Sequence, residues 1–164
     1  VKHYFTPLET GIYSAVSILG RIILFASAAI HMVVFPKASD MYEAGKKHFH
    51  ILLKGLLLTS LISGGIVLAY LFFPEEIVMT IFGVRYAGAI PYLSKYGLVI
   101  FFFSLTGLLV SYSLSINRTR IAIPLFIFLI AEVLLISYCS TISEVINMMI
   151  IISFLTFITM LVYV

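Results

Sequence analysis

Residues Gly11–Ser39 read GIYSAVSILGRIILFASAAIHMVVFPKAS, an apolar stretch long enough to cross a lipid bilayer as a helix. Arg21 lies well inside this stretch. A charged side chain at that depth costs about 2.5–3.5 kcal/mol on insertion scales, so it usually faces a bundle interior or a water-filled cavity. The polar and small residues that share a helical stripe with Arg21 are Thr10, Ser14, Ser17, Ala28 and His31. We therefore expect a helix with one side facing lipid and one side lining a passage.

The composition of the 164-residue chain indicates an integral membrane protein. Hydrophobic residues make up 62% of the chain and charged residues only 10%, whereas soluble domains carry about 25% charged residues. The net charge of +3 is spread over the expected loops. This distribution is explained by membrane topology and does not indicate a nucleic-acid partner. The single cysteine, Cys139, excludes an internal disulfide.

The two ends of the sequence look like cuts. The chain opens on Val1 with no initiator methionine, and it ends on Val164 inside an apolar run. The first ten residues show no signal-peptide pattern. We expect the chain to be a fragment of a longer protein.

The apolar runs predict an all-α membrane protein, a polytopic bundle of about five transmembrane helices within one transmembrane region, residues 1–164. The first span is expected to stop near Pro36, because proline breaks the helical hydrogen-bond ladder. The run IVMTIFGV is too short to cross a membrane and predicts a short interfacial helix ended by Gly83. The expected spans cover residues 11–35, 51–73, 94–115, 121–138 and 145–164.

Local signals refine this picture at helix ends and helix contacts. Thr141 and Glu144 have the capping-box spacing at the start of the last span. Ser60 and Gly64 form a small-xxx-small pair, which allows close helix contact in lipid. Pro124 is expected in the first turn of the fourth span, where a missing N–H costs least. A seam of small residues in the third span consists of Gly97, Ser104, Gly107, Ser111 and Ser115.

The distribution of basic residues predicts the orientation. With five crossings, the loops 36–50 and 116–120 lie on one side of the membrane, with Lys37, Lys46, Lys47, Arg118 and Arg120. The other side has Lys2, Arg85 and Lys95 beside four glutamates. The excess of Lys and Arg predicts that loops 36–50 and 116–120 are cytoplasmic in a multi-pass protein of the cell membrane.

Four short motifs occur in order along the chain. They are Gly11–Ala15 (GIYSA), Phe35–Ser39 (FPKAS), Phe82-Gly83 with Tyr86 and Leu93, and Asn117–Arg120 (NRTR). Together they resemble the polysaccharide-export, O-antigen-type flippase branch of the multidrug/oligosaccharidyl-lipid/polysaccharide superfamily. The last motif departs from the branch, because Asn117 stands where glycine is common.

The resemblance implies a C-terminal-lobe region of a larger transporter, with the N-terminal lobe of the same protein absent. Such proteins consist of two six-helix bundles that alternate between inward- and outward-facing states around a central cavity. Their substrates are lipid-linked oligosaccharides with a diphosphate bridge, moved among membrane lipids. No enzymatic chemistry and no cofactor are expected.

Four residues are candidates for substrate binding in such a cavity. Arg21 can hold a diphosphate in bidentate fashion, with Ser14 and Ser17 on the same stripe. The alternative for Arg21 is a pair with a carboxylate or a helix end on another span. Lys54 either attracts anionic substrate at the cytoplasmic mouth of the cavity or extends its side chain to the lipid headgroups.

Glu132 is the one acidic residue deep in an expected span. It is a candidate for coupling to protons or cations, or a partner for Arg21. The alternative is a protonated glutamate hydrogen-bonded to a neighbouring helix. His31 is expected to be a packing residue, and two histidines, His48 and His50, are too few for a metal site.

Other function classes remain as alternatives. The nearest is a cation-coupled multidrug exporter of the same superfamily. Such an exporter binds organic cations, and a cavity that contains Arg21 would bind them poorly. A membrane glycosyltransferase or polymerase should have a large outer loop with catalytic clusters, which the sequence lacks. A scaffold that transports nothing would not need an arginine at this depth.

Overall fold

Five long helices in the computed structural model, which describes residues 6–164, are apolar enough to cross a membrane. The prediction of an all-α polytopic bundle is confirmed, and the chain is a multi-pass membrane protein by this criterion. Lys2, used in the orientation argument, lies outside the described residues. The elements are α1 (Pro7–Glu43), α2 (Phe49–Phe72), α3 (Pro74–Phe82), η1 (Val84–Ala89), α4 (Ile90–Ser115), η2 (Thr119–Ile121), α5 (Ala122–Ser137) and α6 (Ile142–Tyr163).

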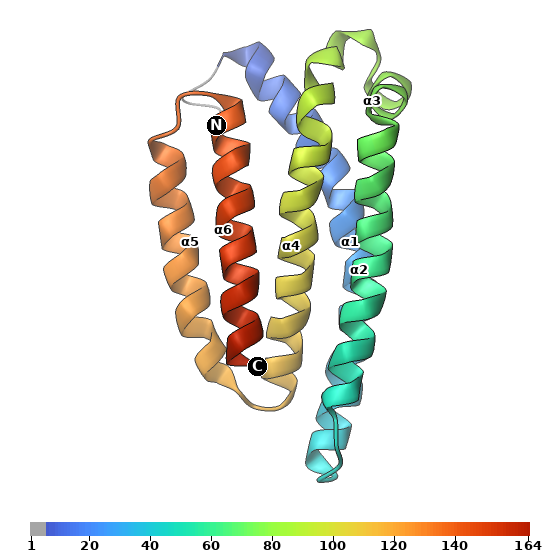
Figure 1. Ribbon diagram of the computed structural model, residues 1–164, viewed down its shortest axis with the longest axis vertical. Helices are drawn as coiled ribbons and strands as arrows, with labels where there is room; N and C mark the ends of the chain where they lie inside the picture. Colours follow the sequence, from blue (N-terminus) through green and yellow to red (C-terminus); the bar gives the residue numbers. More distant parts are fainter. Residues whose placement is uncertain (1–5) are drawn as a thin grey trace.

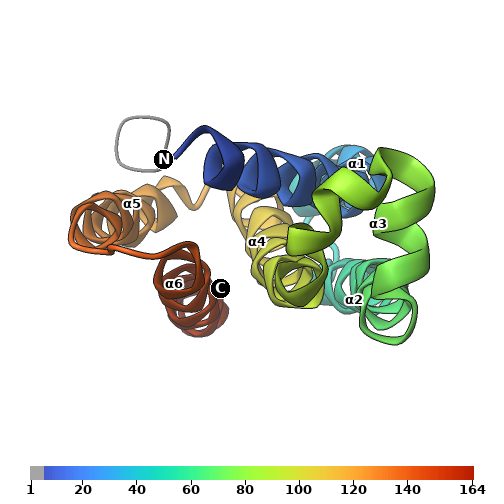
Figure 2. The same ribbon diagram turned by 90° about the horizontal axis from the view of Figure 1, so that it is seen from above.

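The helix α4 occupies the centre of the bundle. Figure 1 shows α5, α6, α4 and α2 side by side, with α1 crossing behind α4 toward α2. Seen from above, α4 lies between α1 and α2 on one side and α6 on the other, and α5 is outermost (Figure 2). Half of the most apolar part of Val84–Ser115 is buried, compared with 11% for Thr119–Ser137. The packing of the bundle is therefore organised on α4.

The helix α1 does not stop at Pro36, so that prediction was wrong. It continues to Glu43, and the N–H of Ala44 still donates to the carbonyl of Asp40 at 3.1 Å. A proline removes one N–H from the ladder, but the turns on either side keep theirs, and membrane helices tolerate this loss. The extension makes α1 about 55 Å long, which exceeds the roughly 30 Å of the hydrocarbon core. Lys37 therefore belongs to a helix and not to a loop.

The first, third and last spans begin three to four residues earlier than predicted, at Pro7, Ile90 and Ile142, but the predicted signals at Thr141, Gly83 and Pro124 are confirmed. The hydroxyl of Thr141 accepts from the N–H of Glu144 at 3.2 Å, and the glutamate accepts from the N–H of Thr141 in return. An unpredicted capping box of the same kind, Thr6 with Glu9, starts α1. The short helix α3 ends at Gly83, whose φ of +80° suits glycine. Pro124 lies in the first turn of α5.

Two apolar clusters and a polar layer between them make up the core. One cluster, with Val16, Ile23 and Leu93 among its members, lies toward the α3 end. The other includes Leu108 and Tyr112 and lies toward the turn that joins α1 to α2. Between them lie buried hydroxyl side chains from three helices, Ser27 of α1, Thr59 and Ser63 of α2, and Ser104 and Thr106 of α4.

Small residues bring α1 and α2 close to α4. A Cβ added at Gly20 would lie 2.5 Å from the Tyr96 ring, and one at Gly97 would lie 3.2 Å from the Tyr70 ring. Gly97, a member of the predicted small-residue seam of α4, therefore lies at a close contact between α4 and α2. The predicted pair Ser60 and Gly64 is half-buried, and a Cβ at Gly64 would lie 3.6 Å from the Phe101 ring of α4, whereas the fully buried small pair of α2 is Thr59 and Ser63. Small side chains occur at both registers of α2, so the sequence alone did not distinguish them.

We predict that Gly20→Leu destabilises the protein by about 1–3 kcal/mol, the usual range for overpacking. The Tyr96 ring is buried and packs edge-on against Tyr13, so it has little room to move. Gly65→Leu is the matched control, because no atom lies within 4 Å of a Cβ at Gly65. Thermal unfolding of the protein in detergent measures the effect, and equal melting temperatures for the two variants would contradict this packing.

Candidate functional site

Arg21 lies on the outer surface of α1, away from the core. Its side chain is exposed, while its neighbour Gly20 packs against Tyr96 and Ile100 of α4. These two residues lie about 9–15 Å along α4 from its start at Ile90, in a helix that is long and apolar enough to cross a membrane. Within residues 6–164 no ion pair or hydrogen bond engages the guanidinium. The described helices therefore do not neutralise or solvate this charge.

Ser14 and Ser17 share the stripe of Arg21 but differ in their contacts. The Ser14 hydroxyl is exposed and donates to the carbonyl of Thr10 at 2.8 Å. The Ser17 hydroxyl is half-buried and accepts from the Tyr96 hydroxyl at 3.5 Å. The Ser14 hydroxyl thus forms its hydrogen bond within α1, whereas the Ser17 hydroxyl contacts α4 through Tyr96.

Lys54 lies in a different part of the molecule from these three residues. It lines a groove of about 370 Å³ between α1 and α2, together with Lys37 and His50. Lys37 follows Arg21 by 16 residues, about 24 Å along α1. The structure therefore brings Arg21, Ser14 and Ser17 together on one stripe and places Lys54 at another site.

Glu132 lines a separate cavity of about 400 Å³, between α1, α4, α5 and α6. It is half-buried and is the only charged residue of the lining, which is otherwise mostly apolar. Among the described residues its carboxyl group forms no ion pair with Arg21. Leu24, one turn after Arg21, is the contribution of α1 to the cavity wall.

A further polar group of this cavity, Thr106 of α4, could not be singled out from the sequence. Thr106 is 5% exposed, and its hydroxyl has no hydrogen-bond partner among residues 6–164. The hydroxyl of Thr156, from α6 in the same wall, is paired with the carbonyl of Ile152 at 2.7 Å. A threonine in an apolar helix normally satisfies itself in this way, so only the tertiary structure reveals the unpaired group.

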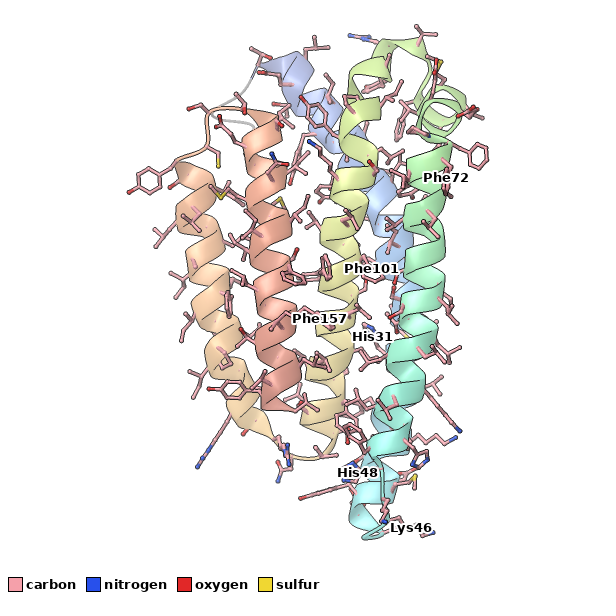
Figure 3. The ribbon with its side chains drawn as sticks, viewed as in Figure 1. His31, Lys46, His48, Phe72, Phe101 and Phe157 are labelled. Atoms are coloured by element: carbon pink, nitrogen blue, oxygen red, sulfur yellow. The ribbon has the colours of Figure 1, made fainter. Side chains whose placement is uncertain are left out.

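The histidines do not gather into a site. His31 lies at mid-bundle (Figure 3), beside Gly107, and its Nε2 is buried without a partner. His48 shares a hydrogen bond of 2.7 Å with the Tyr112 hydroxyl, and His50 lies apart in the α1–α2 groove. Within residues 6–164 no three side chains among His, Cys, Asp and Glu are placed to hold a metal ion.

The departure at Asn117 has a structural reason. Its φ is +60°, in the left-handed region that glycine adopts freely and asparagine tolerates better than most residues. The turn from α4 into η2 requires this backbone conformation. The positive φ at this position therefore suits asparagine better than most other residues with a side chain.

Comparisons of the chain with models of known protein families, with curated proteins and with solved structures found no match. The resemblance to the flippase branch therefore rests on the four sequence motifs alone.

We predict that Thr106→Val leaves the stability of the protein unchanged or raises it by about 1 kcal/mol, because it removes a buried hydroxyl that has no partner. Thr156→Val is the control, since it removes a hydroxyl that is paired. Melting temperatures in detergent measure both variants. A loss of more than about 1 kcal/mol for Thr106→Val would mean that this hydroxyl is paired in the protein.

Proposed function

We propose that the chain is part of a transporter that flips lipid-linked oligosaccharides across the cell membrane by alternating access. The observation that carries this proposal is Arg21, an exposed guanidinium in a helix apolar enough to cross a membrane, which the described helices leave unpaired. A charge within a membrane-spanning helix needs water, an anion or a polar protein surface. A cavity between this bundle and a second lobe would supply the water, and the diphosphate bridge would supply the anion.

In this mechanism Arg21 binds the diphosphate through two parallel N–H···O bonds, which are strong in a low-dielectric cavity. Ser14 and Ser17 add hydroxyl groups along the same stripe. The lipid tail of the substrate stays in the bilayer while the two lobes rock around the cavity. The end of the bundle with Lys37, Lys46 and Arg118 faces the cytoplasm, in accord with the excess of basic residues there.

We predict that Arg21→Ala abolishes flipping and that Arg21→Lys retains part of it, because lysine keeps the charge but loses the bidentate geometry. The assay is export of surface polysaccharide by cells that express the protein at its natural length. Arg120→Ala is the control, since Arg120 is exposed in the turn before α5. Normal export by Arg21→Ala, at normal protein levels, would overturn the proposal.

A second candidate function is a cation-coupled multidrug exporter of the same superfamily, and the cavity around Glu132 favours it. Apolar walls with a single carboxyl group suit a lipophilic organic cation, or a proton that exchanges with one. Under this hypothesis the drug-binding cavity contains Glu132, and Arg21 lies outside it.

The two functions make opposite predictions for Glu132→Gln and Arg21→Ala. For an exporter, Glu132→Gln makes cells sensitive to lipophilic cations while Arg21→Ala does not, because the carboxylate is the group that attracts the cation. Glu76→Gln is the control, since Glu76 is exposed in the first turn of α3. Unchanged drug sensitivity in cells with Glu132→Gln would exclude the exporter.

A further inference from the structure

The groove between α1 and α2 has a charged end and an apolar end. Its walls are residues 26–37 of α1 and residues 50–62 of α2, and it encloses about 370 Å³. The basic residues Lys37, His50 and Lys54 lie at the end near the turn between the two helices. From there to the middle of the bundle the walls are aliphatic, with Ile30 and Val33 on α1 and Leu58 and Ile62 on α2.

The three basic residues come from two helices and converge because of helical spacing. His50 and Lys54 are four residues apart and share a face of α2. Lys37 is four residues after Val33, so it continues the groove-lining face of α1. It holds this position only because α1 remains helical beyond Pro36. All three side chains are exposed, and none forms an ion pair with a described carboxylate.

The groove has the length of one leaflet. From Lys37 to Ala26 the wall of α1 rises about 16 Å, and from His50 to Ile62 the wall of α2 rises about 18 Å. Half of a hydrocarbon core of about 30 Å is about 15 Å. A free phosphate would leave the apolar walls uncovered, and an apolar chain alone would leave the basic cluster unpaired. An amphiphile with an anionic head and one extended tail satisfies both.

We propose that the α1–α2 groove binds an anionic phospholipid. Its phosphate contacts Lys37, His50 and Lys54, and one acyl chain lies along the groove toward Ile62. Basic pockets between transmembrane helices favour such headgroups. The site does not depend on the transport function, because Arg21 lies on another face of α1 and outside the groove.

The test uses the protein at its natural length in phosphatidylcholine vesicles. Each sample contains a trace of phosphatidylglycerol or of phosphatidylcholine, with a photoactivatable group in the acyl chain. Cross-linked peptides are then identified by mass spectrometry. We expect phosphatidylglycerol to label the aliphatic groove walls preferentially over phosphatidylcholine. The preference for phosphatidylglycerol over phosphatidylcholine should fall about fivefold in Lys37→Gln and again about fivefold in Lys54→Gln. Each basic residue near a membrane surface contributes about 1 kcal/mol to binding an anionic lipid.

The matched control is Lys46→Gln with Lys47→Gln, two lysines near the same turn that do not line the groove. It should keep the preference. Ala29→Phe keeps the basic cluster and fills the apolar part, so it should reduce labelling by both probes. The proposal is overturned by equal labelling with the two lipids, by an unchanged preference in the Lys37 and Lys54 variant, or by an equal loss in the control.

Discussion

The close approach of α1 to α4 at Gly20 is the contact on which the bundle depends. The Tyr96 ring occupies the space where any larger residue would place its Cβ. Because lipid tails are as apolar as the side chains, helices in a membrane gain little by burying hydrophobic surface, and they depend on close packing. The contact also sets which face of α1 points inward and therefore leaves Arg21 outward.

The polar layer at mid-bundle follows the same logic. Serine and threonine are small enough to let helices approach, and their hydroxyls can return to the backbone one turn earlier. Ser27 does so, with a 2.7 Å bond to the carbonyl of Ile23. Thr59 and Ser104 have no partner for their hydroxyls. In this layer the gain from close packing is therefore partly offset by the cost of burying hydroxyl groups.

The helix α1 connects three distinct environments. One face packs against α4 and α2, a second contributes Leu24 to the cavity of Glu132, and a third forms the groove that ends at Lys37. The stripe of Arg21 lies between the last two. The length of α1 beyond Pro36 is what places a basic cluster on a helix surface. The arrangement separates the charged candidates along one helix instead of collecting them in a single cavity.

Local composition and short-range patterns were enough to predict the number of spans, the short helix ended by Gly83, the capping box at Thr141 and an arginine inside an apolar span. These features follow from local composition and from periods of a few residues, which a single chain displays directly. The register of α2, the continuation through Pro36, the unpaired hydroxyl of Thr106 and the separation of Lys54 from Arg21 were decided by tertiary structure. Each of them depends on which faces of neighbouring helices meet, and that choice is made by packing between residues far apart in the chain.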